Sequence, residues 1–225
     1  MRQLTVFVAL VFLLVCVNVE HGGAHGSATA VTWNREVSRI VFEKCASCHN
    51  PSGTAFSMLT YLDAQPRANE IKDAVLSRRM PPWGAIKGFG TFRNDQSLSQ
   101  EQIEILTRWV DGGIRRGNNP QMLPRLPDLT PKPVVPLEPA VVVRGTTRLN
   151  RALLLDGVIP EDVPAGGSAR VIAMLPNGRV EPLVWLHGYA NRYRHPFLFR
   201  RPIMLPEGTT IRGLPAEAAL GLISR

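Results

Sequence analysis

Cys45, Cys48 and His49 are the residues whose types and spacing point most directly to chemistry. They stand in the run Cys45-Ala46-Ser47-Cys48-His49, a C-x-x-C-H pattern. Two thiols at this spacing can each form a thioether with one vinyl group of the same porphyrin, and the adjacent imidazole then offers a nitrogen to the iron. The pattern therefore predicts one covalently attached haem c, held at Cys45 and Cys48, with His49 as an iron ligand.

Two other chemistries use paired cysteines. A zinc site needs four ligands, and His187 and His195 are too distant in the sequence to complete a compact site with the two cysteines. A thiol–disulfide site usually opens a helix after a strand, whereas this pair follows a predicted helix. Metal binding, a redox dithiol and a chance match stay as alternatives to the haem.

The second axial ligand of the iron is predicted at Met80, which is followed by Pro81 and Pro82. The prolines restrict the backbone and remove two N–H donors that would be costly to bury, which suits a loop carrying a sulfur over a haem face. Met58 is the competing sulfur, although its apolar neighbours predict ordinary packing. The predicted iron ligands are therefore His49 and Met80.

Two further residues are expected to contact the cofactor. Trp83 follows the proline pair and is expected to line the haem pocket, with a core position as its alternative. Arg79 precedes Met80, and its guanidinium is expected to pair with a haem propionate, with a solvated helix end as its alternative.

Three helices are expected to position these residues. Apolar residues recur at three- and four-residue spacing over residues 32–44 and lead into the cysteine pair. A second helix is expected over residues 68–79, ended by the prolines. The third begins at Ser99, which forms a capping box with Gln102, and it closes at residues 112–113, a glycine pair.

The second half of the chain has a different pattern. Seven prolines fall within residues 120–139 and predict an extended, stiff connector. Beyond it, apolar runs over residues 168–175 and 180–186 flank Pro176-Asn177-Gly178, a strong hairpin signal. Further strands are expected over residues 140–143, 152–155, 197–205 and 209–212. The predicted organisation is an all-α domain over residues 31–119, the connector, and a small antiparallel β domain over residues 140–225.

The first 30 residues have the order of a secretory signal peptide. Arg2 precedes an almost unbroken apolar run over residues 4–19, and the small residues 28–30 supply a cleavage site. We therefore expect export, to a periplasm or beyond, and a soluble mature chain. The alternative is an uncleaved N-terminus that anchors the protein to a membrane.

The net charge of the chain indicates which kinds of partner it would attract. The sequence has 26 basic and 18 acidic residues, a net charge of +8. This excess predicts attraction to an acidic redox partner or an anionic membrane surface, with solubility as the alternative. No basic block is interleaved with aromatic residues, so nucleic acid is not an expected partner.

The region from about residue 32 to 120 resembles a class I cytochrome c domain. The resemblance rests on the helix leading into the C-x-x-C-H run, on Met80-Pro81-Pro82-Trp83, and on a final helix carrying Trp109-Val110-Asp111-Gly112-Gly113. It looks closest to a subgroup of environmental bacteria in which the second motif is followed by Phe92-Arg93-Asn94-Asp95. The resemblance implies His49 as proximal ligand, Met80 as distal ligand and transfer of single electrons.

The last third is similar to the C-terminal half of copper type II, ascorbate-dependent monooxygenases, over residues 168–178, 183–186 and 205–209. Where that family places paired copper histidines, this sequence has Ile159-Pro160-Glu161-Asp162-Val163, and it ends soon after residue 209, before a later copper ligand would appear. The expected fold is thus an all-α cytochrome c domain followed by a small antiparallel β-sandwich-like domain without copper ligands.

The functional expectation is an electron carrier and not an enzyme, with both axial positions of the iron filled. The β domain is expected to place it within a larger complex with redox protein partners. One alternative is a haem enzyme of peroxidase type, in which Met80 leaves the iron, although no distal His or Arg is evident for peroxide cleavage. Another is a cytochrome subunit that serves a partner or a copper site on the β domain.

Overall fold

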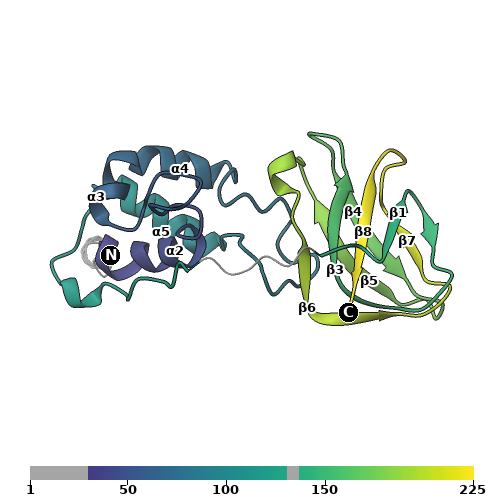
Figure 1. Ribbon diagram of the computed structural model, residues 1–225. Helices are drawn as coiled ribbons and strands as arrows, with labels where there is room; N and C mark the ends of the chain where they lie inside the picture. The colour runs from purple at the N-terminus through teal and green to yellow at the C-terminus, as the bar shows by residue number, and fades with distance from the viewer. Residues whose placement is uncertain (1–29, 131–136) are drawn as a thin grey trace, which may run out of the picture. The chain divides into compact units, whose positions relative to one another are not determined.

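The computed structural model describes residues 30–130 and 137–225, which form helices in the first stretch and antiparallel strands in the second (Figure 1). The expected signal peptide, except for its last residue, and residues 131–136 of the expected connector lie outside the described residues. Val31–Arg225 group into one unit by their contacts. Within the described residues, no helix has the length and apolar character needed to cross a membrane.

Short helices make up the first stretch. They are η1 (Trp33–Val37), α2 (Ser38–Lys44), α3 (Tyr61–Ala64), η2 (Gln65–Arg67), α4 (Ala68–Leu76), α5 (Gln100–Asp111) and η3 (Pro120–Met122). The predicted capping box starts α5, because the Gln102 N–H donates to Ser99 Oγ at 3.1 Å and the Ser99 N–H donates to Gln102 Oε1 at 2.9 Å. Apolar residues of η1, α2, α4 and α5 share one core around Trp33 and Trp109, whose ring centroids are 5.9 Å apart.

Two four-stranded antiparallel sheets form the β part (Figure 1). The strands are β1 (Val141–Arg144), β2 (Thr147–Arg148), β3 (Leu153–Asp162), β4 (Ala169–Met174), β5 (Val180–Leu186), β6 (Phe197–Leu205), β7 (Thr210–Arg212) and β8 (Ala219–Ser224). One sheet has the order β1-β8-β3-β6 and the other β2-β7-β4-β5. The predicted hairpin joins β4 and β5, and its Gly178 has a φ of 83°, which the turn requires.

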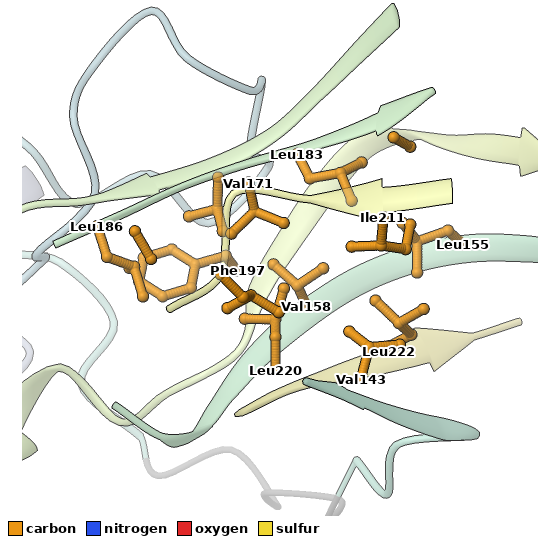
Figure 2. Close-up of a cluster of buried hydrophobic side chains, with 14 of the residues drawn as sticks. Val143, Leu155, Val158, Val171, Leu183, Leu186, Phe197, Ile211, Leu220 and Leu222 are labelled. Atoms are coloured by element: carbon orange, nitrogen blue, oxygen red, sulfur yellow. The ribbon is translucent and has the colours of Figure 1, made fainter. Parts of the chain in front are cut away.

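The inner faces of the sheets meet in one apolar core (Figure 2). Val171, Leu183 and Ile211 belong to one sheet, and they face side chains such as Phe197 and Leu222 from the other. Two packed sheets share such a core between their inner faces, and burying each large side chain there contributes about 1.5–3 kcal/mol.

Strand β8 lies inside its sheet, between β1 and β3, and five of its six residues are buried. Gly221 in this strand has room only for a hydrogen, because an added Cβ would lie 2.8 Å from both Pro139 Cβ and Ile159 Cγ2. The end of the proline-rich stretch therefore packs directly on the sandwich at this strand.

The expectation of an all-α domain followed by a small β domain is wrong. Of the described residues, 24% are helical and 26% are in strands, and the strands form two antiparallel sheets. In the described residues the three longest helices, α2, α4 and α5, hold 7, 9 and 12 residues. Moreover Trp83, Ala85 and Phe92, inside the expected helical boundaries, belong to the core of the sandwich.

The residues between α4 and α5 explain why the first part of the chain is not an all-α domain. Residues 81–90 hold two prolines and three glycines, so no helix can form there. The stretch instead pairs at two points with edge strands, Ala85 with Leu186 of β5 and Phe92 with Phe199 of β6. These strands are the edges of different sheets on the same side of the sandwich. We call residues 83–94 the edge segment.

Candidate cofactor-binding site

The C-x-x-C-H run forms a tight turn at the end of α2. The Cys45 N–H completes the helix by donating to Val41 O at 2.9 Å, and the N–H groups of Cys48 and His49 both donate to Cys45 O, at 3.1 and 2.9 Å. Both thiols are free. The structure therefore brings Cys45, Cys48 and His49 together in a single turn, which the spacing predicted.

The two thiols differ in their surroundings. Cys45 packs partly buried against the helical core, whereas Cys48 is exposed. Burial raises the pKa of the Cys45 thiol to about 12, with a further rise from Cys48 and a smaller opposing effect from Lys44. The Cys45 sulfur therefore keeps its proton at neutral pH.

His49 is oriented by one hydrogen bond. Its Nδ1 lies 2.9 Å from the carbonyl oxygen of Phe56, and its ring packs edge-on against the Phe56 ring, with centroids 4.7 Å apart. A carbonyl oxygen only accepts, so Nδ1 carries the proton. This tautomer leaves the lone pair on Nε2, the nitrogen that would bind a metal ion.

Asn50 and Gly53 hold the turn, and neither is among the site residues predicted from the sequence. The buried Asn50 side chain donates to Ala46 O at 2.8 Å and to Ser47 O at 3.2 Å, and its Oδ1 accepts from the Ser52 N–H at 2.9 Å. An added Cβ at Gly53 would collide with Cys48 O. An asparagine directly after the histidine was the available signal for this support.

Met80 lies just beyond α4, and 41% of its surface is exposed. Its N–H donates to Ala74 O at 3.2 Å, and no described contact joins its side chain to the cysteine turn. Met58, the competing sulfur, is 3% exposed within the helical core, and its N–H donates to His49 O at 3.1 Å. Of the two sulfurs, Met80 is the accessible one.

Arg79 and Trp83 have contacts of their own. The exposed Arg79 donates from Nε to Ser77 Oγ at 3.0 Å, within its own turn. Trp83 is buried in the sandwich core and stacks on His195, with ring centroids 5.1 Å apart and planes inclined by 26°. The described contacts of Trp83 are therefore those of a core residue, and none of them is to the cysteine turn.

Four exposed apolar side chains fall between the cysteine turn and Met80, with Met80 itself included. Phe56, Leu62, Leu76 and Met80 are all exposed large apolar residues of this stretch. Other exposed apolar residues occur along the chain, such as Met122, Leu123 and Leu126, so exposure alone does not mark a cofactor site.

His187, His195 and Met204 carry nitrogen and sulfur donors that a copper ion could use, but they are scattered. His187 Nδ1 lies 3.2 Å from Ser168 Oγ, His195 packs between Trp83 and Phe197, and Met204 is exposed on β6. Among the described residues, no group of three or more His, Cys, Asp or Glu side chains could hold a metal ion. The stretch 159–163 forms the end of β3 and the residue after it.

The donor set of the cysteine turn fits a haem better than a bare metal ion. It offers two free thiols and one imidazole with Nε2 available, which suits two thioether bonds and one iron ligand. A four-ligand zinc site would need further donors that the described residues do not gather there. No protein family, curated protein or solved structure matches the chain.

Proposed function

We propose that this protein is an exported c-type haem protein that carries single electrons. Cys45 and Cys48 hold the haem through thioether bonds, and His49 Nε2 binds the iron. The observation that carries the proposal is the hydrogen bond between His49 Nδ1 and Phe56 O, because in the neutral imidazole it places the lone pair on Nε2, beside two free thiols. The predicted signal peptide supports export, where c-type haem is attached.

The thioether bonds need no oxidant. Each thiol adds its sulfur to one carbon of a vinyl group and its hydrogen to the other, so the S–H bond breaks as the S–C and C–H bonds form. The high pKa of Cys45 keeps that hydrogen on its sulfur at neutral pH. When bound, the haem supplies an iron that accepts and releases one electron.

Met80 is the proposed second axial ligand. It is an exposed sulfur at the end of the stretch that also exposes Phe56, Leu62 and Leu76. A methionine ligand raises the reduction potential relative to a second histidine. With His49 and Met80 both holding the iron, a bound haem would have no open position for a substrate and would exchange electrons with partner proteins, and the net charge of +8 favours acidic partners.

The test is the absorbance spectrum of the exported protein, oxidised and reduced, in a host that attaches c-type haem. We expect haem that survives denaturation, sharp low-spin reduced bands, and a methionine–iron charge-transfer band that Met80→Ala abolishes. Met58→Leu is the matched control and should keep the band, because Met58 is buried in the helical core.

Three results would contradict the proposal. Absence of covalent haem would return Cys45 and Cys48 to dithiol or metal chemistry. A charge-transfer band lost only in Met58→Leu would move the ligand to Met58. Peroxide turnover above that of free haem, with a high-spin iron, would replace the carrier by a haem enzyme.

A further inference from the structure

Met80 lies at a junction between two separately held parts of the chain. On its N-terminal side, the N–H groups of Arg79 and Met80 both donate to Ala74 O, at 2.9 and 3.2 Å, which ties Met80 to the last turn of α4. On its C-terminal side, only Pro81 and Pro82 separate it from Trp83.

Trp83 is fixed inside the sandwich core. It is 4% exposed, it stacks on His195, and it packs edge-on against Phe92 and Phe197 with centroids 5.8 and 4.8 Å away. Rings buried in this way hold a defined position, because close-packed cores leave little room for movement.

Hydrogen bonds attach the rest of the edge segment to β5 and to the chain at the start of β6. The Ile86 N–H donates to Trp185 O at 2.8 Å, and the Arg93 N–H donates to Leu198 O at 2.8 Å. The Asn94 side chain donates to Pro196 O at 2.8 Å and accepts from the Leu198 N–H at 3.0 Å. The chain after Trp83 is therefore attached to both sheets.

The link from Trp83 back to Met80 is short and stiff. Each proline ring fixes its own φ, and the Trp83 N–H donates to Pro81 O at 2.9 Å, across the link. Few conformations of Met80 are then compatible with Trp83 in the core and Ala74 at the helix end.

We infer that Trp83 is a positioning residue for Met80, and that the sandwich holds the sulfur on the iron through this anchor. The inference rests on the proposed function. Without the anchor, Met80 is tied only to α4, and the fraction of molecules in which its sulfur leaves the iron rises. An external ligand such as imidazole then binds more tightly, in proportion to that fraction.

The first test measures imidazole binding and the methionine–iron charge-transfer band in the purified holoprotein. Trp83→Ala should weaken the band and lower the dissociation constant of imidazole by about tenfold. This is the change expected if the fraction of molecules with the Met80 sulfur off the iron rises about tenfold. Trp83→Phe, which keeps a ring in the core, should restore both readouts. Leu222→Ala is a control for general loosening of the sandwich, since Leu222 is buried on β8, which is not one of the edge strands that contact the edge segment.

A second pair of variants leaves Trp83 in place, in case Trp83→Ala does not fold. Gly84 and Gly88 have φ values of 74° and 87°, so alanine is strained at both. An added Cβ at Gly84 would lie 2.6 Å from the Tyr193 ring, whereas at Gly88 it would meet nothing within 4 Å. Gly84→Ala should therefore displace the anchor and tighten imidazole binding, and Gly88→Ala should not.

The outcomes separate the inference from the proposed function. Unchanged imidazole affinity in Trp83→Ala and Gly84→Ala, or an equal change in Leu222→Ala and Gly88→Ala, would overturn the positioning role while leaving the carrier intact. A wild-type protein without covalent haem, or with a charge-transfer band that survives Met80→Ala, would overturn the proposed function itself.

Discussion

His49 and the two cysteines show how a short motif acquires its chemical character from its neighbours. The sequence alone specifies two thiols and an imidazole, but the Phe56 carbonyl selects the His49 tautomer and the helical core raises the pKa of Cys45. Neither effect depends on a residue within the motif, except for the charge of Cys48. The chemistry of this turn therefore depends on the loop that follows it and on the helical core that covers Cys45.

The difference between the thiols predicts selective modification of the protein produced without haem. At pH 8, a pKa of about 12 leaves roughly one Cys45 in ten thousand as the reactive thiolate. We therefore expect iodoacetamide to modify the exposed Cys48 much faster than Cys45, as followed by peptide mass spectrometry. In denaturant, where the core no longer covers Cys45, the two rates should become similar. Equal rates in the folded protein would show that Cys45 is not buried.

At the level of elements, the sequence was most informative where the determining contacts are local. The capping box of α5 and the hairpin between β4 and β5 depend on residues within a few positions of each other. Strand β8 was not predicted, because an internal strand with both faces covered lacks the alternation that marks an exposed one.

The edge segment was not predicted for a related reason. Its partners lie about a hundred residues further along the chain, as in the bond from Arg93 Nη1 to Phe199 O at 2.7 Å. Prolines and glycines correctly excluded a helix, but no local pattern could identify the strands it would join. The same limit applies to the site: the cysteine turn followed from spacing, whereas the position of Trp83 did not.

The ion pair between Arg93 and Asp156 predicts a pH-dependent attachment of this segment. Both guanidinium nitrogens donate to the carboxylate, at 3.1 and 2.7 Å, and these hydrogen bonds are the main cause that lowers the pKa of Asp156. A carboxyl whose pKa is lowered on folding contributes stability above its unfolded pKa of about 3.9, and loses it as the pH falls through the folded value.

Arg93→Ala should therefore lower the free energy of unfolding by about 1–2 kcal/mol at pH 7, less than a fully buried pair because Arg93 is partly exposed. The difference from wild type should shrink below about pH 4. Arg144→Ala, which breaks an exposed pair with Asp162, is the control and should cost less than about 0.5 kcal/mol. Urea titrations across pH measure both, and an equal cost at pH 3 and pH 7 would count against the ion pair.

At the scale of the whole molecule, the two hydrophobic cores do not follow the chain as two consecutive blocks. The helical core draws on residues before and after the edge segment, from Trp33 to Val110, while the sandwich core includes Trp83, Ala85 and Phe92. The proline-rich stretch is thus only one of the covalent links between the two cores. The other links are the two ends of the edge segment.

This arrangement predicts that cutting the proline-rich stretch will not separate the protein. With a specific protease site inserted after Leu126, the cleaved fragments should elute together in gel filtration, because the edge segment of the first fragment completes the core of the second. The double variant Phe92→Ala with Arg93→Ala, cut in the same way, should release its fragments. Separation of the wild-type fragments would show that the edge segment adds little binding energy.

The edge segment and its partner strands are far apart in the sequence, so their contacts form after the cysteine turn during folding. The cysteine turn is complete once residues up to about Phe56 are available to fold, but Trp83 has no core to enter until β5 and β6 have followed. Contacts between such distant residues form late in folding. We therefore expect that a chain ending before Val180 still accepts covalent haem but shows no methionine–iron charge-transfer band. Maturation would then proceed in two stages, with the cofactor fastened first and its second ligand secured only when the last strands are in place.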